Sequence, residues 1–137
     1  MSVDLTVYLP RRAMPDPHDW ANAIAEAGFP AELDPDFDVD DFSGFLPCRY
    51  AGAEAGFEYQ SGSIEIVDEL ELPDDFDFSV TFATHSSMRE LASSVVSAAV
   101  LCWISRGVLV DPQADVAVAA DDAIAWARGQ LEEIEID

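Results

Sequence analysis

Several segments of the chain alternate between apolar and polar residues, which is the period of half-buried β-strands. At 3–9 the odd-numbered positions are valine or leucine, and at 76–82 the even-numbered positions are phenylalanine or valine. The second segment is the most regular, and we expect it at the centre of a sheet. Ser61-Gly62 predicts a hairpin turn, and Pro47 predicts a sheet edge or a bulge. Shorter strands are predicted at 45–50, 57–60, 63–67, 108–110 and 116–118.

Apolar residues recur with helical spacing between Ser87 and Gly107 and cover most sides of the helix predicted at 87–106. Ser87 and Glu90 form a capping-box pair that predicts its first turn. Gly107 is the residue expected to adopt the left-handed conformation that ends it. A helix that is apolar on most sides is buried, so we expect this one to be the core helix. Two further helices are predicted, from Asp16-Pro17 to about residue 27 and from about Asp121 onwards.

The order of these elements predicts one α+β domain spanning 1–137. We expect a mainly antiparallel sheet with about three helices packed on one face and the 87–106 helix at the centre. The apolar run of that helix is shorter than the roughly 20 residues that cross a bilayer. At the N-terminus no basic segment precedes an apolar one, so a signal peptide is not expected. We therefore expect a cytoplasmic protein that does not enter a membrane.

The net charge of the chain indicates which classes of molecule it can bind. There are 28 acidic and 6 basic residues, which give a net charge of −22, and every basic residue is an arginine. Such a chain repels nucleic acid and anionic membranes and attracts basic protein surfaces. We therefore expect a basic protein partner and no direct binding to nucleic acid. Two other origins of the composition stay open, a salt-loving source and a GC-rich genome that favours arginine over lysine.

Acidic residues gather in two blocks, 32–42 and 65–77, where carboxylates are interleaved with apolar residues. The apolar members are predicted to fix the backbone while the acids point outward and form a dense anionic face. Such a face speeds association with a basic partner to about 10⁸–10⁹ M⁻¹s⁻¹ at low salt in favourable cases, whereas affinity needs buried aromatic anchors. The predicted partner-binding acids are Asp34, Asp36, Asp38, Asp40, Asp41, Asp68, Glu69, Glu71, Asp74 and Asp75. The candidate anchors are Tyr8, Tyr50, Phe57 and Tyr59.

No catalytic residue, metal ligand or cofactor site is predicted. The alternating acids from Asp34 suggest a calcium loop, but an EF-hand needs glycine at its sixth position and glutamate at its twelfth. This chain has Val39 and Phe45 there. Cys48 with His85 is the one pairing that offers a nucleophile and a base, and no local motif supports it. A small hydrolase or metal-dependent enzyme that uses some of the acids stays as an alternative of a different class.

The small size, the acidity, the single α+β domain and the lack of a catalytic set resemble the small immunity proteins of bacterial toxin systems. The segment Gly107-Val-Leu-Val-Asp111-Pro112-Gln113, between the core helix and a final helix near Asp121, is also similar to that group. The resemblance implies a cognate toxin as partner, often a basic nuclease or another toxic enzyme whose active site is covered. It assigns a role to no individual residue.

These features together predict a non-enzymatic inhibitor that neutralises a basic toxin through its acidic blocks. The alternative binding function is a nucleic-acid mimic, for example a phage-encoded inhibitor directed at a DNA-binding or defence enzyme.

Overall fold

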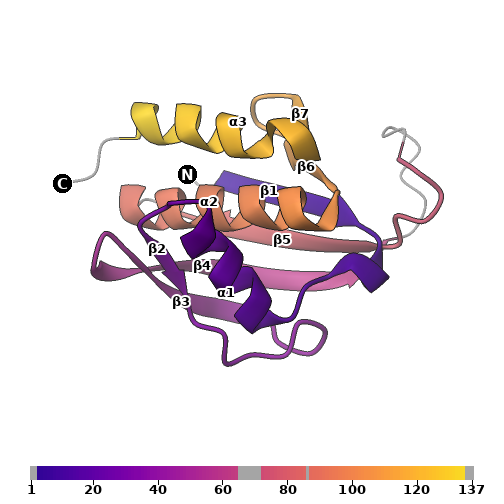
Figure 1. Ribbon diagram of the computed structural model, residues 1–137, viewed down its shortest axis with the longest axis horizontal. Coiled ribbons are helices and arrows are strands. Elements are labelled where there is room, and N and C mark those ends of the chain that lie inside the picture. The colour runs from indigo at the N-terminus through magenta and orange to yellow at the C-terminus, as the bar shows by residue number, and fades with distance from the viewer. Residues whose placement is uncertain (1–2, 65–71, 86, 135–137) are drawn as a thin grey trace.

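In the part of the chain that the structure describes, the strands form one antiparallel sheet, and the α-helices pack on it (Figure 1). The computed structural model describes residues 3–64, 72–85 and 87–134. Within these ranges the strands are β1 (Val3–Leu9), β2 (Ala31–Leu33), β3 (Gly44–Tyr50), β4 (Ala53–Ser63), β5 (Phe78–Thr84), β6 (Val108–Asp111) and β7 (Val116–Ala119). The helices are the short 3₁₀ helix η1 (Arg11–Ala13), α1 (Pro17–Glu26), α2 (Met88–Ser105) and α3 (Ala120–Glu133). The order of the strands in the sheet is β2-β3-β4-β5-β1-β6-β7.

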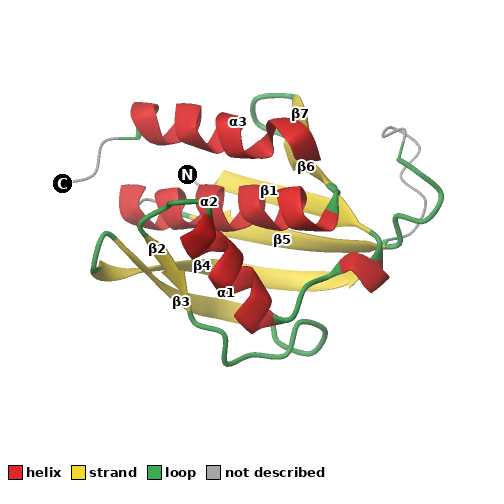
Figure 2. Cartoon of the chain, viewed as in Figure 1, coloured by secondary structure: helices red, strands yellow, loops and turns green. Residues whose placement is uncertain are grey.

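The alternation within each strand decides which face the helices cover. Leu5 and Val7 of β1 lie opposite Phe82 and Val80 of β5, and all four side chains are buried. Thr6 points to the other face and is only half-buried. Figure 2 shows the three α-helices on the same side of the sheet. The predicted α+β class is therefore confirmed, and β5 occupies the central position expected for the most regular strand.

α2 is the core helix of the fold, as its sequence predicts. It begins where the Ser87 hydroxyl accepts the backbone N–H of Glu90 (3.2 Å). Among the described residues, α2 is the one helix that is long and apolar enough to cross a membrane, so the expectation that its run is too short was wrong. However, 67% of it is buried inside the protein. That burial is typical of the core helix of a globular domain.

Trp20 of α1 connects the helical layer to the sheet. Its indole Nε1–H donates to the backbone carbonyl of Ser97 in α2 (3.1 Å). Its ring centroid lies 5.9 Å from that of Phe82, in an edge-to-face arrangement. Asp16 begins α1 by accepting the N–H of His18 (2.8 Å), which is the N-cap that the sequence predicts. α1 is thereby fixed at both its beginning and its buried face.

The hairpin predicted at Ser61-Gly62 is absent, because β4 continues through both residues. Ser61 lies opposite Val80 and Gly62 opposite Ser79 in the ladder between β4 and β5. The turn-forming sequence is overridden by eleven residues of continuous strand. The strand predicted at 63–67 lies mostly outside the described residues.

β3 is not an edge strand, although it contains Pro47. The short strand β2, which the sequence pattern did not predict, pairs with Cys48–Tyr50 and covers that side of β3. This ladder stops one residue short of Pro47, so the missing N–H leaves no gap in it. The carbonyl oxygen of Pro47 accepts the N–H of Asp34 (3.3 Å), which follows β2 directly.

The end of α2 differs from the prediction in which residue takes the left-handed conformation. Arg106 adopts it, with φ of 59°, and Gly107 follows. Gly107 is required for a different reason, because a Cβ there would lie 2.5 Å from the backbone carbonyl oxygen of Tyr8. Glycine at 107 therefore lets the end of α2 approach β1 closely.

We predict that Gly107→Ala lowers the free energy of unfolding by about 1–3 kcal/mol, because β1 or the end of α2 must move to accept the methyl group. Urea denaturation of the purified protein measures this loss. Gly129→Ala is the matched control, since a Cβ at Gly129 in α3 meets no atom within 4 Å. It is expected to raise stability by about 0.5–1 kcal/mol, as alanine does in an exposed helix. Equal effects of the two substitutions would contradict the close-approach explanation.

Candidate functional site

The first acidic block forms a loop between β2 and β3 whose carboxylates shape their own backbone. Asp34 Oδ1 accepts the N–H of Asp36 (3.0 Å). Asp38 Oδ1 accepts the N–H groups of Asp40 (2.9 Å) and Asp41 (3.0 Å). These are Asx-type turns, in which a carboxylate replaces a backbone acceptor. All five aspartates are exposed, so the loop presents a row of negative charges to solvent.

Apolar residues hold this loop against the core, as the interleaved pattern predicts. The ring of Phe37 lies 5.2 Å from that of Tyr59 and 6.3 Å from that of Trp20. The hydroxyls of Tyr59 and Ser61 both donate to the carbonyl oxygen of Val39 (2.8 and 2.6 Å). Burial raises the pKa of Tyr59 to about 12, so its hydroxyl keeps the proton it donates. The loop is thus fixed by β4 beneath it.

Arg11 of η1 links the first acidic block to the second. Its Nε and Nη2 atoms donate to Oδ1 and Oδ2 of Asp40 (2.9 and 2.6 Å). Its backbone N–H donates to Oδ1 of Asp77 (2.8 Å). Its guanidinium carbon lies 5.3 Å from the ring centroid of Phe78, within the range of a cation–π contact. One residue therefore contacts both blocks and the first residue of β5.

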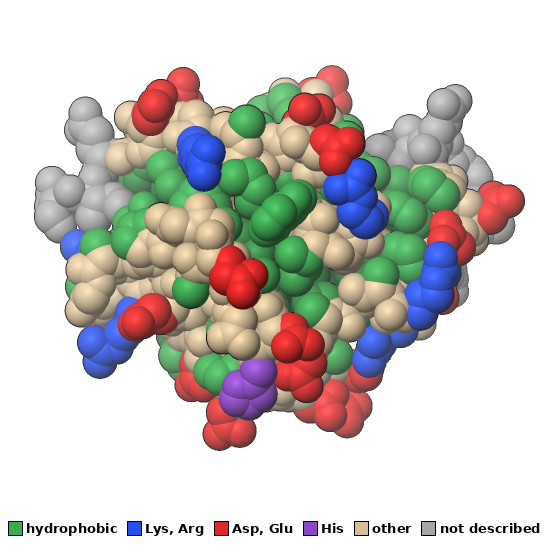
Figure 3. All heavy atoms as spheres, in the orientation of Figure 1, with side chains coloured by type: hydrophobic (Ala, Val, Ile, Leu, Met, Phe, Trp, Pro, Cys, Tyr) green, Lys and Arg blue, Asp and Glu red, His purple; other side chains and the backbone are tan. Residues whose placement is uncertain are grey.

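Arg12, the next residue of η1, forms an ion pair with Asp75 of the second block. We use the name acidic surface for the described aspartates of the two blocks, Asp34, Asp36, Asp38, Asp40, Asp41, Asp74, Asp75 and Asp77. Figure 3 shows carboxylates along the lower and right-hand edges of the molecule, with arginines among them on the right, and further carboxylates at the top and near the centre. The predicted contact residues Asp68, Glu69 and Glu71 lie outside the described residues.

The aromatic residues suggested as anchors do not lie on the acidic surface. Tyr50, Phe57 and Tyr59 are 7%, 1% and 1% exposed and belong to the hydrophobic core. Phe57 lies opposite Leu46 in the β3–β4 ladder, on the face that the helices cover. Tyr8 is half-buried on the other face of the sheet. The three buried residues are therefore not available to contact a partner of the folded protein.

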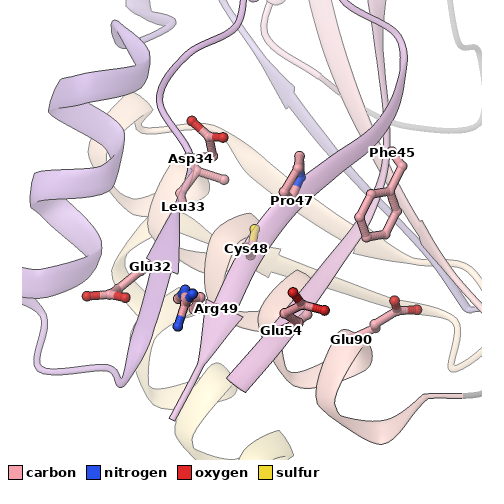
Figure 4. Close-up of a pocket in the computed structure, with 10 residues that line it drawn as sticks. Glu32, Leu33, Asp34, Phe45, Pro47, Cys48, Arg49, Glu54 and Glu90 are labelled. Atoms are coloured by element: carbon pink, nitrogen blue, oxygen red, sulfur yellow. The ribbon is translucent and has the colours of Figure 1, made fainter. Parts of the chain in front are cut away.

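A groove of about 680 Å³ adjoins the acidic surface at the β2–β3–β4 end of the sheet. Its charged lining residues are Glu32, Asp34, Arg49, Glu54 and Glu90. Arg49 lies in register between Glu32 and Glu54 on the neighbouring strands, and Glu90 comes from the first turn of α2. Figure 4 shows the side chains of Glu32, Arg49, Glu54 and Glu90 spread across the groove. Asp34 belongs to the groove and to the acidic surface, so the two are continuous.

Phe45 forms an apolar wall of this groove and is 49% exposed. A Cβ at Gly56 would lie 2.5 Å from Cζ of Phe45 and 2.6 Å from the carbonyl oxygen of Leu46. The ring therefore occupies space that any other residue at 56 would fill. Sequence reasoning missed Phe45, because a change of one residue in register exchanges Phe45 and Leu46 between the two faces.

The described residues offer charge and apolar contact rather than an activated nucleophile. Burial raises the pKa of Cys48 and of Cys102 to about 12. At neutral pH both are protonated thiols, whereas nucleophilic attack needs the thiolate. Within the described ranges, no group of three or more His, Cys, Asp or Glu side chains is arranged to hold a metal ion.

Comparisons with known proteins add no relative to this picture, since no protein-family model, curated protein or solved structure matches the chain.

The contact between Arg11 and Asp40 can be tested by titration. The hydrogen bond from Arg11 lowers the pKa of the Asp40 carboxyl below its ordinary value of 3.8. Because only the ionised carboxylate accepts both guanidinium bonds, the link between the blocks is present at neutral pH and is lost as the pH falls through this lowered pKa. We predict that Arg11→Gln returns the pKa of Asp40 to the ordinary range in an NMR titration of side-chain carboxyl carbons.

Asp75 is the internal control for that titration. Its pKa is lowered by Arg12, and Arg11→Gln leaves this pair in place. An unchanged pKa of Asp40 in the variant would show that Arg11 does not hold this part of the loop.

Proposed function

We propose that this protein is a non-enzymatic inhibitor of the immunity type, which binds and neutralises a basic toxin protein through the acidic surface. The observation that carries the proposal is that Arg11 contacts both acidic blocks, which are far apart in the sequence, while Arg12 pairs with Asp75 of the second block. Gathering like charges costs self-repulsion, and a basic protein that covers them removes that cost. In this proposal the protein acts in the cytoplasm and needs no cofactor.

The carboxylates of the acidic surface are not equivalent. Asp40 already forms an ion pair with Arg11, and Asp75 forms one with Arg12. Asp36, Asp41 and Asp74 make no side-chain hydrogen bond or ion pair to another described residue, and all three are exposed. These three charges are therefore the ones that a partner meets without competition, and they can be changed without breaking an internal contact.

The proposal is tested by capture followed by charge reversal. We expect the tagged protein, incubated with extract of its native host, to retain one basic protein in stoichiometric amount, loosened as salt rises to about 1 M, where the Debye length is roughly 3 Å. With that protein in hand, the triple variant Asp36→Lys, Asp41→Lys and Asp74→Lys is expected to associate at least about tenfold more slowly at low salt. Stopped-flow association kinetics provide the measurement.

The control variant changes the same number of charges elsewhere. Glu26, Glu132 and Glu133 are exposed residues at the C-terminal ends of α1 and α3. Replacing all three by lysine gives the same net charge as the first variant, and lysine suits the end of a helix. Equal slowing by the two variants would mean that only net charge matters, and no slowing by either would overturn the proposal.

A second function, mimicry of nucleic acid, is favoured by the density of carboxylates on the acidic surface. It requires that the partner use its own DNA-binding site to hold this protein. Competition by duplex DNA for the captured partner separates the two functions. Mutually exclusive binding supports mimicry, and a ternary complex with DNA supports an inhibitor that covers another site.

A further inference from the structure

The groove beside the acidic surface carries a net negative charge, which favours a cationic ligand. Four of its lining side chains are carboxylates and one is a guanidinium. Arg49 donates only a long hydrogen bond, to the carbonyl oxygen of Gly52 (3.5 Å). Within the described residues no carboxylate lies within ion-pair distance of Arg49. The groove therefore keeps an excess of negative charge that its own arginine does not neutralise.

The groove also has an aromatic wall that is fixed before any ligand arrives. Phe45 packs against the bare Cα of Gly56, and about half of its side chain stays exposed. Gly56 itself is held in place, because its carbonyl oxygen accepts the hydroxyl of Ser93 in α2 (3.3 Å). An aromatic ring that is ordered in the free protein loses little conformational entropy on binding.

We propose that this groove receives an arginine side chain of the basic partner, which stacks on the ring of Phe45 and directs its guanidinium to Glu54 and Glu90. This inference rests on the proposed function in so far as the partner is a basic protein. It replaces the buried anchors that the sequence suggested with an exposed one. It also places the anchor next to the charges of the acidic surface, through Asp34.

The chemistry of the lining favours arginine over other occupants. A guanidinium is planar, stacks on aromatic rings and donates several hydrogen bonds to carboxylates at once. The groove combines a ring with carboxylates that come from two different elements, β4 and α2. An acidic or neutral polar side chain would meet the same carboxylates without compensation. Arginine therefore matches the groove both by charge complementarity and by stacking on the ring.

The first test uses a short probe, the blocked peptide acetyl-Gly-Arg-Gly-amide, and ¹⁵N NMR spectra of the intact protein. We expect the peptide to shift the amide signals of Phe45, Glu54 and Gly56. The same peptide with citrulline, which keeps the shape of arginine without its charge, is expected to bind at least about fivefold more weakly. Shifts confined to residues 34–41, or equal binding of the two peptides, would overturn the inference.

Two substitutions in the groove are expected to act in opposite directions. Phe45→Leu keeps an apolar side chain over Gly56 but removes the ring, so it is expected to weaken binding of the arginine peptide by about five- to tenfold. Arg49→Gln removes a repelling charge and is expected to strengthen binding by roughly two- to fivefold. A groove that instead bound an anion through Arg49 would lose affinity in the second variant, which would contradict the proposal.

Met88→Ala is the control for loss of an exposed apolar side chain. Met88 is 45% exposed and does not line the groove, so this variant is expected to bind the peptide as the unchanged protein does. Comparable weakening in Met88→Ala and Phe45→Leu would show a non-specific apolar effect and overturn the inference.

The captured partner then separates this inference from the proposed function. If charge reversal on the acidic surface slows association while Phe45→Leu leaves the dissociation rate unchanged, the groove is not the anchor and the proposed function stands. If the arginine peptide binds in the groove but no basic partner is captured, the proposed function fails and the arginine site remains.

Discussion

The acidic surface depends on the apolar contacts beneath it. Phe37 contacts the rings of Tyr59 and Trp20, and Trp20 is itself bonded to α2 and packed on β5. Each aromatic pair contributes about 0.5–1.5 kcal/mol beyond the area it buries. Repulsion between two carboxylates in water is on the order of 1 kcal/mol even at 4 Å. A few such contacts are therefore enough to hold an exposed, like-charged loop in one conformation.

The two arginines of η1 also reduce the repulsion between the carboxylates, because each forms an ion pair with one of them. Arg11 binds Asp40 with two hydrogen bonds and Asp77 through its backbone, so it orders both blocks at once. A cation that approaches Asp40 from outside must compete with Arg11, and exposed ion pairs of this kind contribute little stability by themselves. The acids with internal contacts and the acids open to a partner are therefore different residues, although they are neighbours in both acidic blocks.

Much of the fold can be predicted from local patterns, because strands and helices have different periods of burial. The alternation at 3–9 and 76–82 and the apolar helix at 87–106 correspond to β1, β5 and α2. The packing of the acidic loop was also predictable, because apolar residues interleaved with its acids mark the positions that contact the core. Pairing between strands cannot be predicted in this way. Ser61-Gly62 has the composition of a turn, and only its pairing with β5 makes it strand.

The same limit explains why the anchor residues were misplaced. Phe45 and Leu46 are adjacent apolar residues, and the sequence does not say which of them faces the helices. The pairing of Leu46 with Phe57 places both under α2 and exposes Phe45. Arg106 shows a similar limit at the end of α2, where it takes the left-handed conformation and Gly107 lies against β1 instead. Long-range contacts, rather than propensity, determine these positions.

Within the described chain, the groove lies where β4 has no neighbouring strand on its β5 side. β5 pairs with β4 only from Glu58 onwards, so residues 53–57 have no strand on that side among the described residues. The first turns of α2 cover the gap, with Ser93 bonded to Gly56 and Arg89 bonded to the carbonyl oxygen of Tyr50 (2.9 Å). The groove walls thus belong to regular strands and a helix, whereas most of the acidic surface lies on loops. Exposed charges suit the guidance of a partner from a distance, and a groove with rigid walls suits the contact that retains it.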